Sequence, residues 1–327
     1  MRAVGFLLLA VAAACREPAE ARGRHERAPE ADGVHVGLST VGASHVRTLV
    51  GFEDPESVRY DPEQDVFFVS NISGFGSNKD NRGYIVRVSA TALDSSEVFV
   101  ESGVGGVTLH APKGMAIQGD TLWVTDIDVV RGFHRRTGHP LGMIDFSAHN
   151  PTQLNDIAVR VGELRVTDTG IWMVYEGNVH TGPDKIFSIT GRTVRLIANS
   201  LSLKLPNGIV WDSLGSRWIV VSFDRHGGEV AEMSAALDST RRILRSGRGH
   251  LDGVEVLRNG AILFSSWADS SIHVWKDGRD VRVIRELPEP ADIGIDTRRG
   301  RVLVPLGVLG QVQVWNLGPW WDSPPTN

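Results

Sequence analysis

From about residue 50 onward, short apolar runs alternate with polar turns. The runs hold four to six residues of Val, Ile, Leu, Trp and Phe, and Gly, Asp or Asn bounds them. The spacing of apolar residues that a helix requires is scarce over the same stretch. Short apolar runs with such boundaries predict β-strands, so this part of the chain is expected to be all-β.

One phrase recurs six times in this stretch: a polar or small residue, then Gly, Asp or Ser, then an alternating apolar strand. The copies begin 39 to 57 residues apart, which is close to the length of a four-stranded propeller blade. Their first residues are Glu56, Lys113, Asn155, Asn207, Asp252 and Ala291. We therefore predict a six-bladed β-propeller over residues 46–318, with four-stranded blades around a central channel and a tail at residues 319–327. A β-sandwich is the alternative, but it does not predict six similar phrases.

The first residues of the six phrases are expected to form a ring, because the innermost strand of each propeller blade lines the central channel. Glu, Asn, Asn and Asp supply only oxygen ligands if the amides turn their carbonyls inward. Such a shell suits calcium, and also manganese or magnesium, whereas zinc prefers His or Cys. For any single position the alternative is a turn residue, because Asn and Asp tolerate turn geometry. Four polar residues in equivalent positions favour a site.

A cation in such a ring suits hydrolysis of an ester or a lactone. It would polarise a carbonyl group and make a water molecule easier to deprotonate, and a neighbouring carboxylate could act as general base. No G-x-S-x-G motif supports a serine hydrolase, and no HExxH motif supports a zinc protease. The tryptophans, Trp267 among them, are expected to pack within the blades.

The phrases PESVRYD, LNDIAV, LPNGIVWD and LDGVEV resemble the metal-site signatures of the senescence-marker-protein/gluconolactonase/luciferin-regenerating-enzyme family. Paraoxonase-type lactonases carry similar pairs of residues. The resemblance covers about residues 50–317. It implies that Glu56, Asn207 and Asp252 hold the metal, with Asp252 doubling as general base. It also implies that Asn155 contacts substrate or bound water, and it makes Asp156 beside it a further candidate for the substrate site.

Lys113 departs from the family pattern. Its ammonium group could take the place of the cation and pair with Glu56 or Asp252, bind an anionic group of the substrate, or extend to the channel mouth without a role. Ala291 offers no ligand in the sixth blade. Two functions follow: a metal-dependent hydrolase of a lactone or related ester, or a non-catalytic propeller that binds a ligand or a protein with Lys113 in its ring.

The N-terminus predicts export. Arg2 precedes an apolar stretch at residues 3–14, which is too short to span a bilayer and suits a signal peptide. The stretch resembles a bacterial lipoprotein signal, in which Cys15 would carry the lipid; an ordinary secretory signal is the alternative. Residues 16–45 are charged and rich in Ala, Pro and Gly, as in a flexible tether. We expect a protein anchored to a membrane and facing the periplasm, or a secreted one.

The composition limits the classes of molecule that the protein is expected to bind. The chain has 327 residues, a formal net charge of -5 and no long basic run, which argues against binding to nucleic acid. A single cysteine excludes an internal disulfide framework and a thiolate zinc site. The family resemblance, and not the composition, implies a small-molecule lactone or ester as the partner.

Overall fold

The computed structural model describes residues 42–322, except residues 75, 77, 170, 175–176, 181–183, 235–239 and 246–248. The predicted signal peptide and nearly all of the predicted tether therefore lie outside the described residues, as does most of the predicted tail. No helix in the described part is long and apolar enough to cross a membrane.

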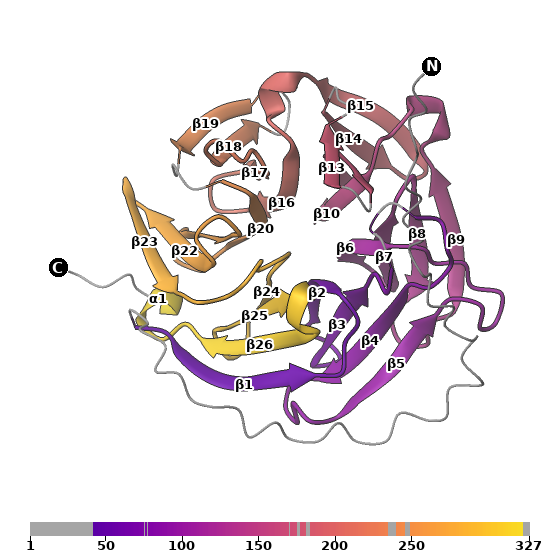
Figure 1. The fold of residues 1–327 in the computed structure, drawn as a ribbon, viewed down its shortest axis with the longest axis horizontal. Helices are drawn as coiled ribbons and strands as arrows, with labels where there is room; N and C mark the ends of the chain where they lie inside the picture. Colours follow the sequence, from indigo (N-terminus) through magenta and orange to yellow (C-terminus); the bar gives the residue numbers. More distant parts are fainter. Residues whose placement is uncertain are drawn as a thin grey trace, which may run out of the picture. The chain divides into compact units, whose positions relative to one another are not determined.

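Six four-stranded antiparallel sheets form a ring, which confirms the predicted six-bladed propeller (Figure 1). Blade 1 contains β2 (Pro55–Asp61), β3 (Val66–Asn71), β4 (Tyr84–Ser89) and β5 (Ser96–Glu101). Blade 2 contains β6 (Pro112–Gln118), β7 (Thr121–Asp126), β8 (Val129–His134) and β9 (Pro140–Asp145). Blade 3 contains β10 (Leu154–Arg160), β11 (Glu163–Asp168), β14 (Lys185–Thr190) and β15 (Thr193–Asn199).

The second half of the ring follows the same plan. Blade 4 contains β16 (Pro206–Asp212), β17 (Arg217–Ser222), β18 (Glu229–Ser234) and β19 (Thr240–Arg245). Blade 5 contains β20 (Leu251–Val256), β21 (Ile262–Ser266), β22 (Ser271–Lys276) and β23 (Arg279–Ile284). Blade 6 contains β24 (Gly294–Asp296), β25 (Arg301–Leu306), β26 (Gln311–Asn316) and β1 (Ser44–Val50). The innermost strand of every blade comes from one of the six phrases.

The ring is closed by strands from opposite ends of the sequence. Strand β1 is the outermost strand of blade 6 and pairs antiparallel with β26, so that Ser44 lies opposite Asn316 and Val50 opposite Gln311. In Figure 1 the indigo strand and the yellow strands form one sheet. The last blade is thereby held together by the first segment of the propeller.

The core lies between neighbouring blades. Val69 of blade 1 belongs to the same buried cluster as Leu303 and Val314 of blade 6. Ala158 of blade 3 packs likewise with Trp218 of blade 4. Each blade therefore buries both of its faces against its neighbours, and full burial of a Val or Leu side chain contributes roughly 1.5–3 kcal/mol.

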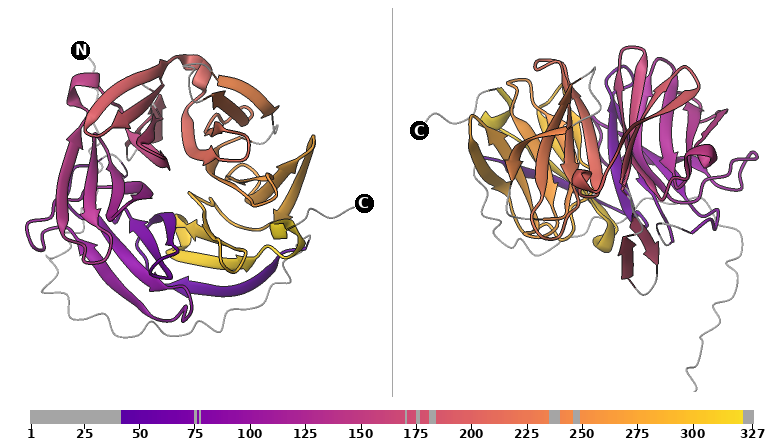
Figure 2. Two further views of the ribbon diagram at one scale, coloured as in Figure 1. Left: turned by 180° about the vertical axis from the view of Figure 1, so that it is seen from behind. Right: turned by 90° about the horizontal axis from the view of Figure 1, so that it is seen from above.

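Short elements lie outside the blades. A hairpin of β12 (Ile171–Val174) and β13 (Gly177–His180) joins β11 to β14 and projects from the ring in Figure 2. The short helices are η1 (Ser147–His149), η2 (Leu201–Leu203), η3 (Gly307–Leu309) and α1 (Pro319–Asp322). Helix α1 lies at the start of the predicted tail, and its Trp320 and Trp321 are buried in the core cluster of blades 5 and 6.

Candidate functional site

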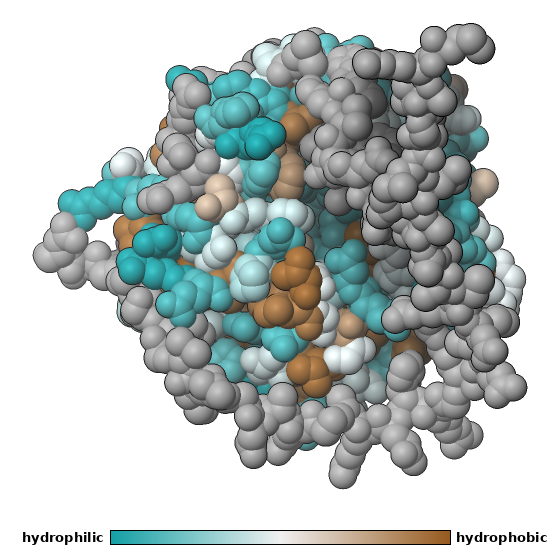
Figure 3. Space-filling view, in the orientation of Figure 1, coloured by the Kyte–Doolittle hydropathy of each residue, from teal (hydrophilic) through white to brown (hydrophobic). Residues whose placement is uncertain are grey.

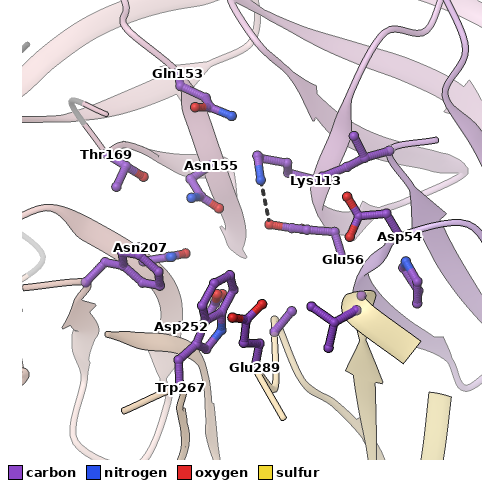
Figure 4. A pocket seen from close by; sticks show the side chains of 16 residues that line it. Asp54, Glu56, Lys113, Gln153, Asn155, Thr169, Asn207, Asp252, Trp267 and Glu289 are labelled. Atoms are coloured by element: carbon purple, nitrogen blue, oxygen red, sulfur yellow. Dashed lines mark hydrogen bonds and ion pairs between the residues drawn. The ribbon is translucent and has the colours of Figure 1, made fainter. Parts of the chain in front are cut away.

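A cavity that is partly open to solvent lies where the innermost strands begin. All six predicted ring positions line it: Glu56, Lys113, Asn155, Asn207, Asp252 and Ala291. Figure 4 shows the five polar side chains turned toward one another from different blades. The structure therefore brings together the residues that the repeated phrase singles out.

A repeated β-bulge points the ring residues into the channel. In blade 1 the pairing of β2 with β3 skips from Pro55 to Val58, so that Glu56 and the residue after it are unpaired. The same irregularity spans Lys113, Asn155, Asn207 and Asp252 in the next four blades. Bulges redirect side chains and often lie beside functional sites. This explains why asparagine, which is disfavoured in strands, is the second residue of β16.

Hydroxyl groups on the second strand of one blade hold the ring residues of the next. Thr125 Oγ1 donates to the carbonyl oxygen of Asn155 at 2.5 Å, and Thr167 Oγ1 donates to that of Asn207 at 2.7 Å. Ser265 Oγ donates to the carbonyl oxygen of Ala291 at 3.0 Å. These bonds fix the spacing between neighbouring ring positions. The recurring Thr-Asp and Ser-Ser pairs that end the second strands are the sequence signal for this contact.

Glycine after a ring residue allows the blades to approach each other closely. A Cβ atom on Gly208 would lie 2.3 Å from the carbonyl oxygen of Asp252. A larger residue there would push β16 and β20 apart, and with them the side chains of Asn207 and Asp252.

Lys113 pairs with Glu56 inside the ring. Its Nζ atom lies 3.1 Å from Glu56 Oε1, and both residues are buried (Figure 4). Burial alone would lower the pKa of Lys113, but the carboxylates of Glu56 and Asp252 outweigh this effect and raise it. Lys113 is therefore a cation in the ring and leaves the other oxygen of Glu56 available.

Three of the buried cavity oxygens that have no hydrogen-bond partner belong to the predicted metal ligands: Glu56 Oε2, Asn207 Oδ1 and Asp252 Oδ1. A buried acceptor without a partner costs about 1–3 kcal/mol. Burial raises the pKa of Glu56 to about 7 and that of Asp252 well above its ordinary value, in spite of Lys113. The single ammonium group of Lys113 therefore does not fully compensate the two carboxylates of the ring. These are the residues that the family resemblance implies as ligands, and their all-oxygen donor set fits a hard divalent cation.

The donor set holds only two carboxylates and one amide. Within the described part of the chain, no three His, Cys, Asp or Glu side chains gather closely enough to hold a metal on their own. Any cation at the ring would thus depend on the amide oxygen of Asn207 and on further ligands such as water or substrate.

Asp156 lies beneath the ring and does not line the cavity. Its Oδ2 atom accepts the backbone N–H of Ile209 at 2.7 Å, and its Oδ1 atom accepts that of Ile157 at 2.6 Å. Its contacts in the structure are therefore structural ones. The contact with substrate that the sequence suggested for it stays a prediction.

A second charged layer occupies the channel below the ring. Arg59 of β2 pairs with Glu255 of β20 at 2.9 Å, with 21% of the Arg59 side chain exposed. Asp156 and Asp292 also stabilise the Arg59 cation, although burial opposes it. Asp292 accepts the hydroxyl of Ser57 at 2.5 Å. One guanidinium group thus compensates the negative charge of three carboxylates in the middle of the propeller.

Blade 5 contains a serine–histidine–aspartate chain that has no catalytic access. Ser271 Oγ lies 2.9 Å from His273 Nε2, and His273 Nδ1 lies 2.7 Å from Asp280 Oδ1. Burial would lower the pKa of His273, but Asp269 and Asp280 overcome this effect and raise it. Ser271 Oγ donates its proton to Asp269 Oδ1 at 2.5 Å, so the hydroxyl is not oriented to give that proton to the imidazole. Both Ser271 and His273 are also buried. This cluster is structural.

The cavity also contains residues that the repeat does not predict. Trp267 follows β21 and lines the cavity, so the expectation that it packs only within its blade is wrong. Phe223, Asp54 and Glu289 lie in connections between strands and reach the same cavity. These connections differ from blade to blade, so no repeated pattern marks them.

Comparisons with known proteins bear on the fold. No family model and no curated protein matches the sequence. A solved structure titled "putative gluconolactonase" is 15% identical, with a TM-score of 0.59, and the match covers 89% of this chain and 97% of that one. A chain from a nidogen/laminin complex is 14% identical, with a TM-score of 0.53, and the match covers 72% and 90%. Fold alone does not fix function.

Proposed function

We propose that this protein is a metal-dependent hydrolase of a lactone or related ester, with a divalent cation held by Glu56, Asn207 and Asp252. The observation that carries this proposal is the set of three unpartnered buried oxygens, which come from three blades and line one cavity. Oxygen-only ligands favour calcium, with manganese or magnesium as alternatives. The fold shared with a structure titled as a gluconolactonase is consistent with this chemistry.

The residues around the cavity would have different roles in hydrolysis. When bound, the cation would polarise the substrate carbonyl and acidify a nearby water. Asp252 takes a proton from the attacking water as its oxygen bonds to the carbonyl carbon. The carbon–oxygen bond of the ester then breaks, and the same proton returns to the departing oxygen. Asn155 orients the substrate from blade 3, where its side chain is free to contact a ligand.

Removal of bound metal should abolish hydrolysis. We expect elemental analysis of the purified protein to find one divalent ion per chain, and we expect a panel of five- and six-membered lactones and aryl esters to include a substrate. Dialysis against a chelator should remove both the ion and the activity, and calcium should restore them. Activity that survives complete removal of metal would refute the metal requirement. A metal-loaded protein that hydrolyses no member of the panel would refute the hydrolase.

The second candidate is a non-catalytic binding propeller in which Lys113 is the cation of the ring. The 3.1 Å ion pair between Lys113 and Glu56 favours it. In this case the ammonium group compensates for Glu56 and Asp252, and the open cavity receives a ligand without changing it.

Lys113→Met should distinguish the two candidates by stability in calcium. Loss of the buried ammonium leaves its carboxylate partners uncompensated, which costs roughly 3–5 kcal/mol. In the hydrolase, calcium should bind the variant at least about tenfold more tightly, because a like charge close to the ion is gone, and should restore the stability. In the binding propeller, calcium should restore nothing.

Urea unfolding with and without calcium measures this difference. Lys79→Met is the control, since Lys79 forms an exposed ion pair with Asp128 away from the ring. Exposed pairs of this kind contribute about 0–1 kcal/mol, and calcium should not change the result.

A further inference from the structure

One side of the cavity is an aromatic wall. The rings of Phe223 and Trp267 meet edge to face, with centroids 5.1 Å apart and an interplanar angle of 86°. His250 stacks on Phe223 at 4.6 Å. The three rings therefore pack together as one aromatic cluster at this side of the cavity.

The backbone holds this wall in place. The N–H of Trp267 donates to the carbonyl oxygen of His250 at 3.1 Å, and the N–H of Phe223 donates to that of Leu205 at 2.7 Å. These bonds fix the backbone from which both rings project, and the edge-to-face contact holds the two rings against each other.

Glu289 lies at the rim beside Trp267 (Figure 4). It is exposed and has a φ of 48°, a left-handed conformation that is uncommon for a residue other than glycine. Pro288 and Pro290 flank it and fix their own φ angles. Among the described residues, no hydrogen bond or ion pair engages its carboxylate. Its carboxylate is therefore available to a ligand in the cavity.

The charges lining the cavity favour a cationic ligand. Asp54, Glu56, Asp252 and Glu289 face a single ammonium group, that of Lys113. A divalent ion at the ring would offset the carboxylates nearest to it and leave Glu289 uncompensated on the aromatic side. Apolar and hydrophilic side chains meet around the centre of this face of the ring (Figure 3).

A buried hydroxyl gives an independent sign of a ligand. Thr169 of blade 3 lines the cavity, is 3% exposed, and its Oγ1 atom has no hydrogen-bond partner. Neither the proposed metal ligands nor the ion pair of Lys113 uses this atom.

We infer that Trp267, Phe223 and Glu289 form a subsite for an organic cation, an amine or a quaternary ammonium group. Aromatic faces attract such cations within about 6 Å of the ring centroid, and the nearby carboxylate adds a Coulombic attraction. The ligand would place its cationic end at this wall and its carbonyl oxygen toward the ring. The inference rests on the proposed function for the reacting group only, since binding of the cation requires no hydrolysis.

Choline and neohexanol test the subsite. Neohexanol has the shape of choline, but a tert-butyl group replaces the trimethylammonium group. We expect calorimetric titration of the purified protein to show that choline binds at least about fivefold more tightly, the lower range for cation–π pairs assisted by a carboxylate. Equal affinity for the two compounds, or no binding of choline, would overturn the inference.

Glu289→Gln should remove most of the preference for choline and leave the affinity for neohexanol unchanged. Trp267→Leu should weaken the binding of both compounds. The matched control is Glu286→Gln, because Glu286 is exposed on the same connection, also has a positive φ of 62°, and does not line the cavity. Loss of the preference in Glu286→Gln as well would show that general surface charge attracts choline and would overturn the inference.

The test separates the subsite from the hydrolase. Selective binding of choline by a protein that hydrolyses no ester would support the subsite and refute the proposed function. Hydrolysis of a neutral lactone without selective binding of choline would refute the subsite alone. If both hold, choline esters should have a lower KM than neohexyl esters, with similar kcat.

Discussion

Asp252→Asn is expected to lower kcat for lactone or ester hydrolysis roughly a thousandfold, because it removes a general base together with a charged metal ligand. Elemental analysis should show that bound metal is lost in parallel. The metal-free variant should remain folded, since asparagine has the shape of aspartate and burial raises the pKa of Asp252 well above its ordinary value. A neutral side chain at this position therefore relieves the cost of a buried charge.

Thermal unfolding and activity should be measured together. The control is Asp277→Asn, an exposed position in the turn between β22 and β23 of the same blade, which should leave both unchanged. If the Asp252→Asn variant kept the wild-type kcat, Asp252 would not be the general base. Lost activity with metal fully retained would show that Asp252 acts on the proton only.

Arg59→Met should destabilise the protein by about 2–3 kcal/mol. This is less than the 3–5 kcal/mol of a fully buried pair, because 21% of the Arg59 side chain is exposed. The variant leaves Glu255, Asp156 and Asp292 without their cation. The additional replacement Glu255→Leu should recover only part of the loss, since the two aspartates remain.

The loss of stability in Arg59→Met should be larger at higher pH. Burial raises the pKa of Asp292 to about 6, although Arg59 opposes the shift. A carboxyl group whose folded pKa exceeds its unfolded value of 3.8 binds more protons in the folded state, so stability falls as pH rises through that window. Without Arg59 the pKa of Asp292 rises further, and the pH range over which stability falls extends to higher pH.

Urea unfolding at pH 5 and pH 8 checks this prediction. Arg136→Met is the control, because Arg136 forms an ion pair with Glu63 in which both side chains are exposed and should cost about 0–1 kcal/mol at either pH. A deficit in Arg59→Met that is equal at the two pH values would contradict the assigned role.

The repeated phrase predicted the blades and the ring because it depends only on local structure. Each copy pairs an apolar strand with the residue that a bulge turns into the channel, so Asn207 could be placed without knowing its neighbours. The pairing of Lys113 with Glu56 was one of several alternatives, since it depends on how far an ammonium group reaches between blades.

Other parts of the site depend on contacts that the repeated sequence pattern does not predict. Glu289 and Phe223 lie in connections of unequal length, and Trp267 resembles the tryptophans that pack within blades until its position after β21 is known. Asp156 resembles a ring residue in sequence, but its carboxylate is taken up by the backbone of the next blade. The partner of β1 is separated from it by nearly the whole propeller.

The pairing of β1 with β26 also sets a sequence of events during synthesis. Strand β1 leaves the ribosome before the other strands of the propeller and must wait, with one edge exposed, until β26 has followed it. Contacts between such distant segments form slowly, and a waiting strand edge is a template for pairing with other chains. The polypeptide should therefore be most vulnerable to aggregation just before its final strand emerges, and truncations that remove β26 should be far more harmful than their length suggests.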